Sequence, residues 1–194
     1  MLRYAITEGL LTAGGDYRPL ISRCEKLGRD GVEFLLLREK ALGAGDLAAL
    51  ARQVIQAVDG TGMRVIVPGS AEVALAAGAD GVHLSGGAGE VAVGRARAAF
   101  PGAWVSVSCH SIEEVRRARE DGASAVLFAP VFGKTVGGVE VVRGVGLERL
   151  REACAAAAAE VPVFALGGVI PENAVECARV GARGVAGIRM FFGK

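Results

Sequence analysis

Short apolar runs rich in β-branched residues alternate along the chain with longer amphipathic stretches. In the longer stretches, such as GDLAALARQVIQAVDG, apolar residues recur three and four positions apart, which predicts helices. Strands that alternate with helices predict a parallel sheet. The pattern predicts seven helices between eight strands, which we expect at residues 3–7, 31–39, 64–67, 81–85, 104–110, 125–132, 162–168 and 184–191.

Eight near-equal units of about 25 residues fit a (β/α)8 barrel better than an open doubly wound sheet. The phrases GADGVHL, GASAVLF and GARGVAG recur after helices, with a glycine placed to end each helix. We therefore expect one α/β barrel domain over residues 1–194. Few residues follow the eighth strand, so the eighth outer helix should be missing. A partner subunit or neighbouring helices should then cover the apolar flank at residues 190–192.

Composition restricts the class of protein and of ligand. A chain of 194 residues that is 52% hydrophobic has material for one core, and its net charge of +1 is scattered, which argues against nucleic acid and membrane surfaces. No signal peptide or membrane-spanning run is visible, so we expect a soluble cytoplasmic protein that binds a small molecule. A zinc site or disulfide framework is not expected, because no C-x-x-C or C-x-x-H pattern connects the cysteines, Cys24, Cys109, Cys154 and Cys177.

In (β/α)8 barrels the carboxyl ends of the strands carry function. At the end of the second predicted strand, Leu36, Arg38 and Lys40 share a face at period two, which would direct two cations into the barrel mouth. Two inward cations indicate an anionic substrate. The alternative is a solvated turn beyond the strand.

Both histidines fall near strand ends. His83 lies on the fourth predicted strand, and Ser106, Ser108 and His110 share a face of the fifth. The histidines are candidate acid-base groups, and the alternative is a structural, hydrogen-bonded role. Cys109 lies on the opposite face of its strand and is interpreted as a small buried hydrophobe.

A glycine pair ends the seventh predicted strand. Gly167 and Gly168 would let backbone N–H groups approach a ligand at the start of the next helix, which predicts a phosphate site. Arg189, near the end of the eighth strand, could face the same place. The alternatives are a tight turn and a surface or dimer-contact arginine.

The segment GKTVGGVEVVRGVG follows the sixth predicted strand and is rich in glycine. It contains Lys134, Thr135 and Arg143, a composition that suits a mobile lid over the barrel mouth. A plain flexible connection is the alternative.

Five segments, FLLLREK, AGADGVHL, VSVSCHSIEE, AVLFAPVF and FALGGV, occur in an order and spacing that resemble thiamine phosphate synthase and its relative TenI, the thiazole tautomerase. The resemblance covers essentially the whole chain. It implies a (β/α)8 barrel of thiamine biosynthesis that binds a small phosphorylated thiazole. The residues that match the family are Arg38, Lys40, His83, Ser108, Gly167 and Gly168.

The chain departs from both branches of that family. In the synthase a Q-x-R-x-K motif binds pyrophosphate, and Leu36 replaces its amide here. Gly69 and Ala88 stand about where the synthase has its Mg2+-binding aspartates, and Gly137 stands near the slot of its catalytic lysine. Pro130 replaces the TenI histidine.

At the end of the eighth predicted strand, Arg189 takes the position of a family serine that helps bind phosphate. We therefore expect no metal or cofactor, with Mg2+ required only if the protein is a synthase.

Three functions follow from the resemblance. The first is a TenI-like tautomerase, which holds the phosphate at the glycine pair and Arg189 and neutralises a carboxylate with Arg38 or Lys40. Its candidate catalytic residues are His83, His110 and Lys40. The second is thiamine phosphate synthase, and the third is a non-catalytic ligand-binding or regulatory homologue. A homodimer is expected in each case.

Overall fold

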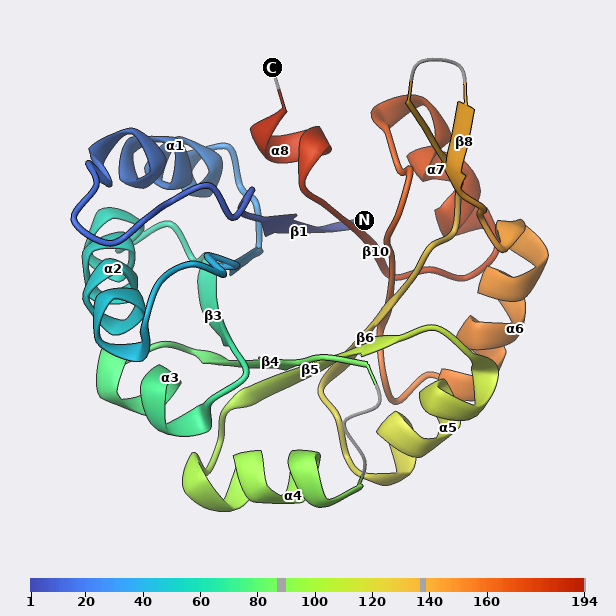
Figure 1. Ribbon diagram of the computed structural model, residues 1–194. Helices are drawn as coiled ribbons and strands as arrows, with labels where there is room; N and C mark the ends of the chain where they lie inside the picture. The colour runs from blue at the N-terminus through green and yellow to red at the C-terminus, as the bar shows by residue number, and fades with distance from the viewer. Residues whose placement is uncertain (87–89, 137–138, 194) are drawn as a thin grey trace.

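A computed structural model describes residues 1–86, 90–136 and 139–193; within these ranges the side chains of residues 90–91, 134–136 and 139–140 are not described. Eight parallel strands close into a barrel in the order β1-β10-β9-β6-β5-β4-β3-β2 (Figure 1). The barrel prediction is confirmed. The barrel strands are β1 (Leu2–Ile6), β2 (Phe34–Leu36), β3 (Arg64–Pro68), β4 (Gly81–Leu84), β5 (Trp104–Cys109), β6 (Ala125–Phe128), β9 (Val163–Ala165) and β10 (Gly184–Gly187).

Helices surround the barrel and alternate with its strands (Figure 1). Local sequence explains several of their ends. Ser111 and Glu114 form a capping box, in which each side chain accepts a hydrogen bond from the other's backbone N–H, and Gly78 ends another helix at a φ of 72°. The helices are α1 (Arg18–Arg29), α2 (Ala44–Ala57), α3 (Ala71–Ala77), α4 (Glu90–Ala99), α5 (Ile112–Glu120), α6 (Gly146–Ala157), α7 (Pro171–Arg179) and α8 (Arg189–Phe192).

Alternation along the strands separates two kinds of core. Inward residues meet inside the barrel, while the residues between them pack against the helices. Inside the barrel, the Tyr4 ring stacks on Phe34 with centroids 5.3 Å apart and meets the edge of Phe164 at 5.3 Å. These packed rings close the interior, so a ligand can enter only at an end of the barrel.

The segment after β6 forms a short antiparallel hairpin of β7 (Lys134–Val136) and β8 (Val139–Val142). Periodicity did not predict these strands, because each is only three or four residues long and glycine-flanked. Gly137 lies outside the described residues, as do the side chains of Lys134 and Thr135. The interpretation of this segment as a lid therefore stays a prediction.

The end of the chain differs from the prediction in two ways. The eighth barrel strand stops at Gly187, and residues expected to extend it form the one-turn helix α8. The prediction that nothing would remain for an eighth helix is therefore wrong. Phe191 and Phe192 are buried against α1, so a neighbouring helix covers the flank that the sequence left open.

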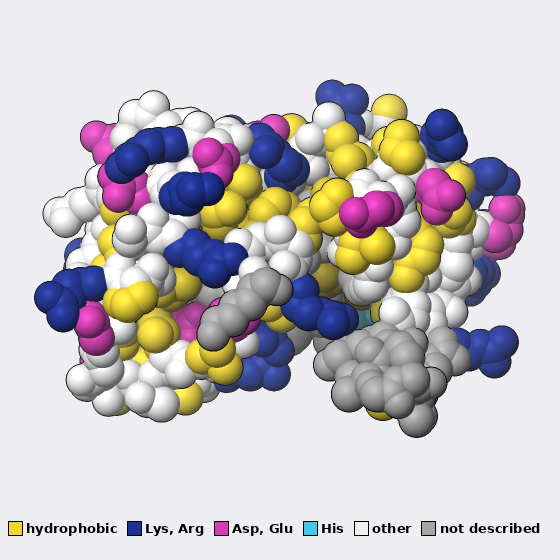
Figure 2. Space-filling view, turned by 90° about the horizontal axis from the view of Figure 1, so that it is seen from above, with side chains coloured by type: hydrophobic (Ala, Val, Ile, Leu, Met, Phe, Trp, Pro, Cys, Tyr) yellow, Lys and Arg dark blue, Asp and Glu magenta, His cyan; other side chains and the backbone are white. Residues whose placement is uncertain are grey.

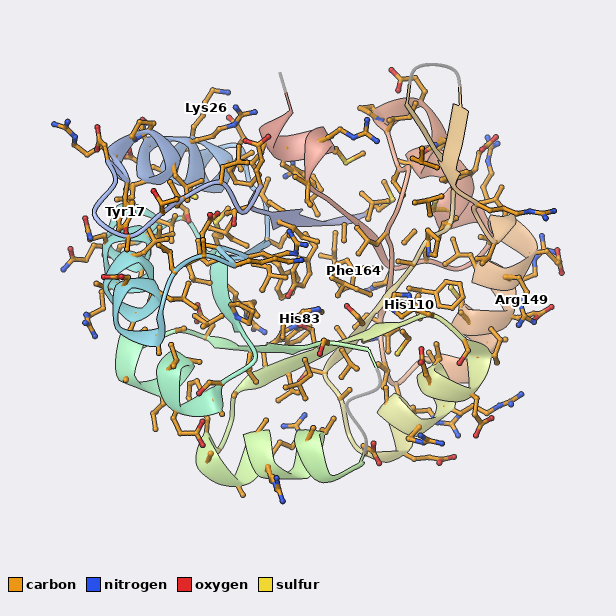
Figure 3. All side chains as sticks on the ribbon, viewed as in Figure 1. Tyr17, Lys26, His83, His110, Arg149 and Phe164 are labelled. Atoms are coloured by element: carbon orange, nitrogen blue, oxygen red, sulfur yellow. The ribbon has the colours of Figure 1, made fainter. Side chains whose placement is uncertain are left out.

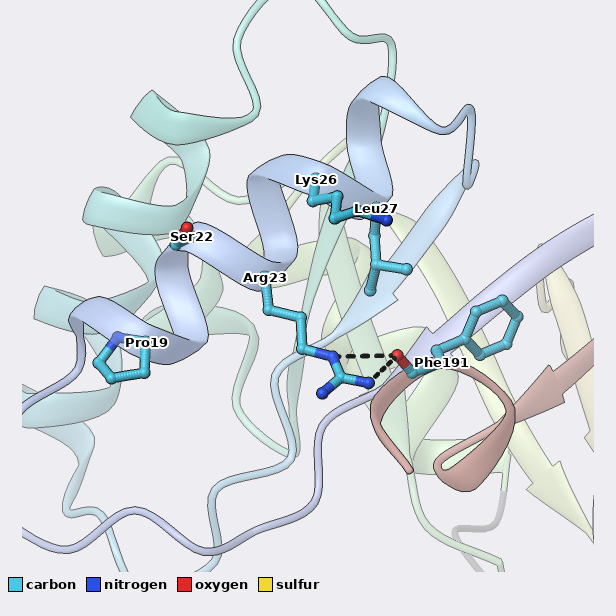
Figure 4. A pocket seen from close by; sticks show the side chains of 6 residues that line it. All are labelled: Pro19, Ser22, Arg23, Lys26, Leu27 and Phe191. Carbon is cyan, nitrogen blue, oxygen red and sulfur yellow. Dashed lines mark hydrogen bonds between the residues drawn. The ribbon is translucent and has the colours of Figure 1, made fainter. Parts of the chain in front are cut away.

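Arg23 of α1 holds α8 in place. Its guanidinium donates to the backbone oxygen of Phe191 at 2.9 Å (Figure 4). It also donates to the backbone oxygen of Gly193 at 3.1 Å. It also lies 5.4 Å from the centroid of the Phe192 ring. These bonds satisfy carbonyl groups at the end of a helix too short to satisfy its own.

The surface carries charges of both signs, and the cysteines are unpaired. Figure 2 shows Lys and Arg side chains interspersed with Asp and Glu over one face of the molecule. All four cysteines are unpaired, and burial raises the pKa of the Cys109 thiol to about 12. None of the helices within residues 1–86, 90–136 and 139–193 has the length and apolar character that a membrane crossing needs.

Candidate active site

The carboxyl ends of the eight strands meet at one rim, which we call the barrel mouth. His83 projects from β4 into the barrel below this rim, and Figure 3 shows it inside the ring of helices, while Arg149 lies at the outer edge. Val82 and Leu84, its neighbours on the strand, point instead to the helix layer. The alternation of GVHL thus places the imidazole inside.

A chain of hydrogen bonds crosses the barrel at His83. Its Nδ1 lies 2.9 Å from Ser106 Oγ, and its Nε2 lies 2.9 Å from Ser108 Oγ. The hydroxyl of Tyr4, which reaches over from β1, lies 3.0 Å from Ser106 Oγ. Burial lowers the pKa of His83 to about 4, so the ring is neutral near neutral pH. Both of its nitrogens are occupied.

His110 is exposed and follows the end of β5. Its Nδ1 lies 2.8 Å from the carbonyl oxygen of Ala129, which can only accept, so Nδ1 carries the hydrogen in the neutral ring. Nε2 is then an acceptor. It lies over Gly86, where a Cβ would come within 3.0 Å of it. Nε2 has no hydrogen-bond partner among the described residues.

The prediction that Arg38 and Lys40 extend one face of the second strand is wrong. β2 ends at Leu36, and Lys40 lies exposed in a turn. The cause is Glu39, which is 3% exposed and accepts hydrogen bonds from the backbone N–H groups of Gly9 and Leu11.

These bonds draw the chain toward the loop after β1 instead of continuing the strand. Arg38 remains half-buried at the mouth, with its Nη1 3.5 Å from where a Cβ on Gly9 would lie.

The glycine pair after β9 lies where the sequence placed it. Gly167 and Gly168 have φ angles of 91° and 65°, which L side chains rarely adopt. A Cβ on Gly167 would lie 2.8 Å from Pro130, and one on Gly168 would lie 2.7 Å from Phe132, so close packing already requires both glycines. Within the described chain, the backbone N–H groups of Gly168 and Val169 donate to no acceptor.

Arg189 was predicted near the end of the eighth strand, and this placement is wrong. The residue begins α8, and its side chain is exposed. Strand β10 pairs with β9, so the start of α8 follows the strand beside the glycine pair. Many (β/α)8 barrels bind phosphate between these two loops.

Of the two positions matched to the family's Mg2+-binding aspartates, the one that the structure describes does not fit Mg2+. Gly69, after β3, offers no carboxylate, and Ala88 lies outside the described residues. In the part of the chain that the structure describes, no three His, Cys, Asp or Glu side chains are grouped to hold an ion. Because Mg2+ requires hard oxygen ligands, apolar and glycine positions cannot replace the aspartates.

Sequence reasoning missed two residues at the site. Tyr4 was not singled out, although it is the polar member of the alternating run LRYAI. Glu39 looked like part of a solvated turn, and no local pattern shows that a distant loop would bury it. Ser106 was placed on the correct face, but its bond to a residue 102 positions away follows only from the closed barrel.

Comparison with known proteins gives consistent family matches. The family model described as thiamine monophosphate synthase matches residues 4–191. A putative thiamine-phosphate synthase of Geobacter sulfurreducens is 37% identical over 174 residues, 90% of this chain and 79% of the relative. A thiamine-phosphate synthase of Methanoregula boonei is 36% identical over 192 residues, covering 98% and 85% of the two chains.

A solved thiamine phosphate pyrophosphorylase of Pyrococcus furiosus has the same fold, with a TM-score of 0.81 at 26% identity over 100% of this chain and 88% of that one. The names of these relatives favour the synthase, the second function considered above, over the tautomerase. The chain therefore belongs to the thiamine monophosphate synthase family and is of the type found in thiamine biosynthesis.

Proposed function

We propose that the chain acts on a thiazole phosphate as a metal-independent tautomerase. The observation that carries this proposal is the geometry of His110. Its Nδ1 donates to the Ala129 carbonyl, while Nε2, which lies beside Gly86 after β4, has no hydrogen-bond partner among the described residues. Nε2 removes the proton from ring carbon C2, and the electron pair shifts through the ring to the exocyclic carbon. The imidazolium then gives a proton to that carbon, which returns His110 to its starting state. The product is the aromatic thiazole, and general acid-base chemistry suffices.

The histidine geometry favours His110 over His83 as the acid-base group. Both nitrogens of His83 are within 2.9 Å of serine hydroxyls, and its depressed pKa of about 4 disfavours uptake of a proton. The backbone N–H groups of Gly168 and Val169 would hold the phosphate, with Arg38 near the substrate carboxylate. Arg189 and Lys40 are exposed and would act only at the edge of the site.

Thiamine phosphate synthase is the second candidate, and the names of the relatives favour it. In that reaction a pyrophosphate leaves a pyrimidine, and its charge must be neutralised as it departs. Among the described residues no three His, Cys, Asp or Glu side chains are grouped to hold a metal ion, and Gly69 stands at the position matched to one of the family's aspartates. For that reason we place the tautomerase first.

Two assays distinguish the functions. Purified protein receives the unaromatised thiazole carboxylate phosphate with EDTA, and separately the pyrimidine pyrophosphate and thiazole phosphate with Mg2+. In the first assay we expect ring aromatisation, at a rate that His110→Gln lowers about 100-fold. In the second assay we expect negligible formation of thiamine phosphate. Thiamine phosphate formation at an enzymatic rate would instead establish the synthase, and inactivity in both assays would leave the ligand-binding homologue.

A further inference from the structure

The hydrogen-bond chain at His83 has a direction that the structure determines. Tyr4 is fully buried, with aromatic rings of Phe34 and Phe164 beside it. Among the described residues its hydroxyl has one partner, Ser106 Oγ. If Ser106 donated this bond, the Tyr4 hydrogen would be left unpaired in an apolar interior, which is unfavourable. Tyr4 therefore donates to Ser106.

The direction continues along the chain. Because Ser106 Oγ accepts from Tyr4, its own hydrogen is available for His83 Nδ1 at 2.9 Å. A neutral imidazole has one acceptor nitrogen and one N–H donor. With Nδ1 accepting, Nε2–H donates to Ser108 Oγ at 2.9 Å. In the opposite tautomer His83 Nδ1 carries the hydrogen, so Nδ1–H and the Tyr4 hydroxyl would both have to donate to Ser106 Oγ. The hydrogen of Ser106 would then have no partner among the described residues.

Ser108 is the end of this chain and lies one residue before the end of β5, partly exposed. Its oxygen accepts from His83, and within the described ranges no other side-chain partner of this hydroxyl is found. We propose that Tyr4 and Ser106 are positioning residues that act through His83 to present the Ser108 hydroxyl as a hydrogen-bond donor at the barrel mouth.

A ligand that binds to Ser108 would then place an acceptor atom, such as a carboxylate or phosphate oxygen, against its hydroxyl. The donor direction rests on the hydrogen-bond geometry alone, whereas the choice of ligand rests on the proposed function.

The direction can be measured in the free protein. Long-range proton–nitrogen NMR on histidine labelled with nitrogen-15 distinguishes a protonated ring nitrogen from an unprotonated one, and His110→Gln assigns the two rings. We expect His83 to carry its hydrogen on Nε2. In Tyr4→Phe the preference for one tautomer should weaken into a mixture, because Ser106 can then accept from Nδ1–H without displacing a donor.

The control is Tyr17→Phe, which removes the other tyrosine hydroxyl, bonded to the Thr12 carbonyl in the loop before α1. It should leave the His83 tautomer unchanged. A wild-type His83 protonated on Nδ1, or a Tyr4→Phe protein whose His83 signals match those of the wild type, would overturn the assignment. A merely structural role for Tyr4 predicts the latter result.

Binding of thiazole phosphate, measured by calorimetry, tests the donor role. Ser108→Ala should weaken binding about 5- to 10-fold and Tyr4→Phe about 2-fold, while Tyr17→Phe should not change it. Equal affinity of Ser108→Ala and wild type would overturn the donor role. If the wild type bound no thiazole phosphate, the proposed function and the ligand choice would fail, while the tautomer measurement would still decide the direction.

Discussion

Protonation of His83 should make a measurable contribution to the destabilisation of the protein in acid. The pKa of this buried ring is lowered from 6.5 to about 4 by desolvation. Between these two values the unfolded chain binds a proton that the folded chain excludes. The free energy of unfolding therefore falls as the pH is lowered through this window, and the contribution of His83 is neutral above it.

The magnitude follows from the two pKa values. Going from about pH 7 to about pH 4.5, the proton-binding difference of one histidine with pKa values of 6.5 and about 4 lowers the free energy of unfolding by about 2 kcal/mol. His83→Gln removes the titrating group but keeps an amide that can hydrogen-bond to a serine. The variant should therefore lose about 2 kcal/mol less than the wild type over the same interval.

Urea unfolding of both proteins at each pH, followed by circular dichroism, measures the difference. Carboxylates with lowered pKa values, such as Asp16 and Glu72, also lose stabilisation in acid, but they are present in both proteins. Their effect cancels in the comparison. Parallel pH profiles for wild type and His83→Gln would show that the folded ring accepts a proton readily, and would refute the reasoning.

Two further changes test the ends of β9 and of the chain. Gly168→Ala should have a free energy of unfolding about 1–3 kcal/mol lower than Gly69→Ala, and it should lose binding of inorganic phosphate. Both glycines have positive φ, but of the two only Gly168 has neighbours within 3 Å of an added Cβ. Equal stability and equal phosphate affinity of the two variants would contradict this. Arg23→Ala should have a free energy of unfolding about 1 kcal/mol lower than Arg18→Ala, because the ion pair that Arg18 forms in the wild type is solvent-exposed. Urea denaturation measures the difference. Indistinguishable midpoints would exclude a role of Arg23 in holding α8.

The barrel was predictable because each unit carries its own signal. Strand runs such as AVLF are apolar on both faces, and helix-ending glycines such as Gly78 recur before them. The element bounds were less predictable. Leu37 continues the apolar run of β2, yet the strand ends because Glu39 bonds to the loop after β1. A contact across 28 or 30 positions leaves no periodic trace in the sequence.

Candidate site residues were predictable as positions, but their chemical states were not. Strand alternation placed His83 and Ser108 inside the barrel. It could not separate the roles of the two histidines, because these depend on partners from other strands. His83 meets Ser106 across a strand pair, and His110 meets the carbonyl of Ala129 after β6. Only closure of the sheet brings these groups together.

The proposed proton transfer would require less charge neutralisation at the barrel mouth than release of a pyrophosphate. The chain of hydrogen bonds from Tyr4 to Ser108 contains only neutral groups, so it contributes a fixed dipole and no net charge. Neutralising a multiply charged leaving group would fall on Arg38 and exposed cations, which water screens. Removing a proton from a thiazole ring develops less charge, and a nearby arginine favours the carbanion that forms. The His110 imidazole, with Nδ1 bonded to the Ala129 carbonyl, would use Nε2 as the acceptor that this step requires.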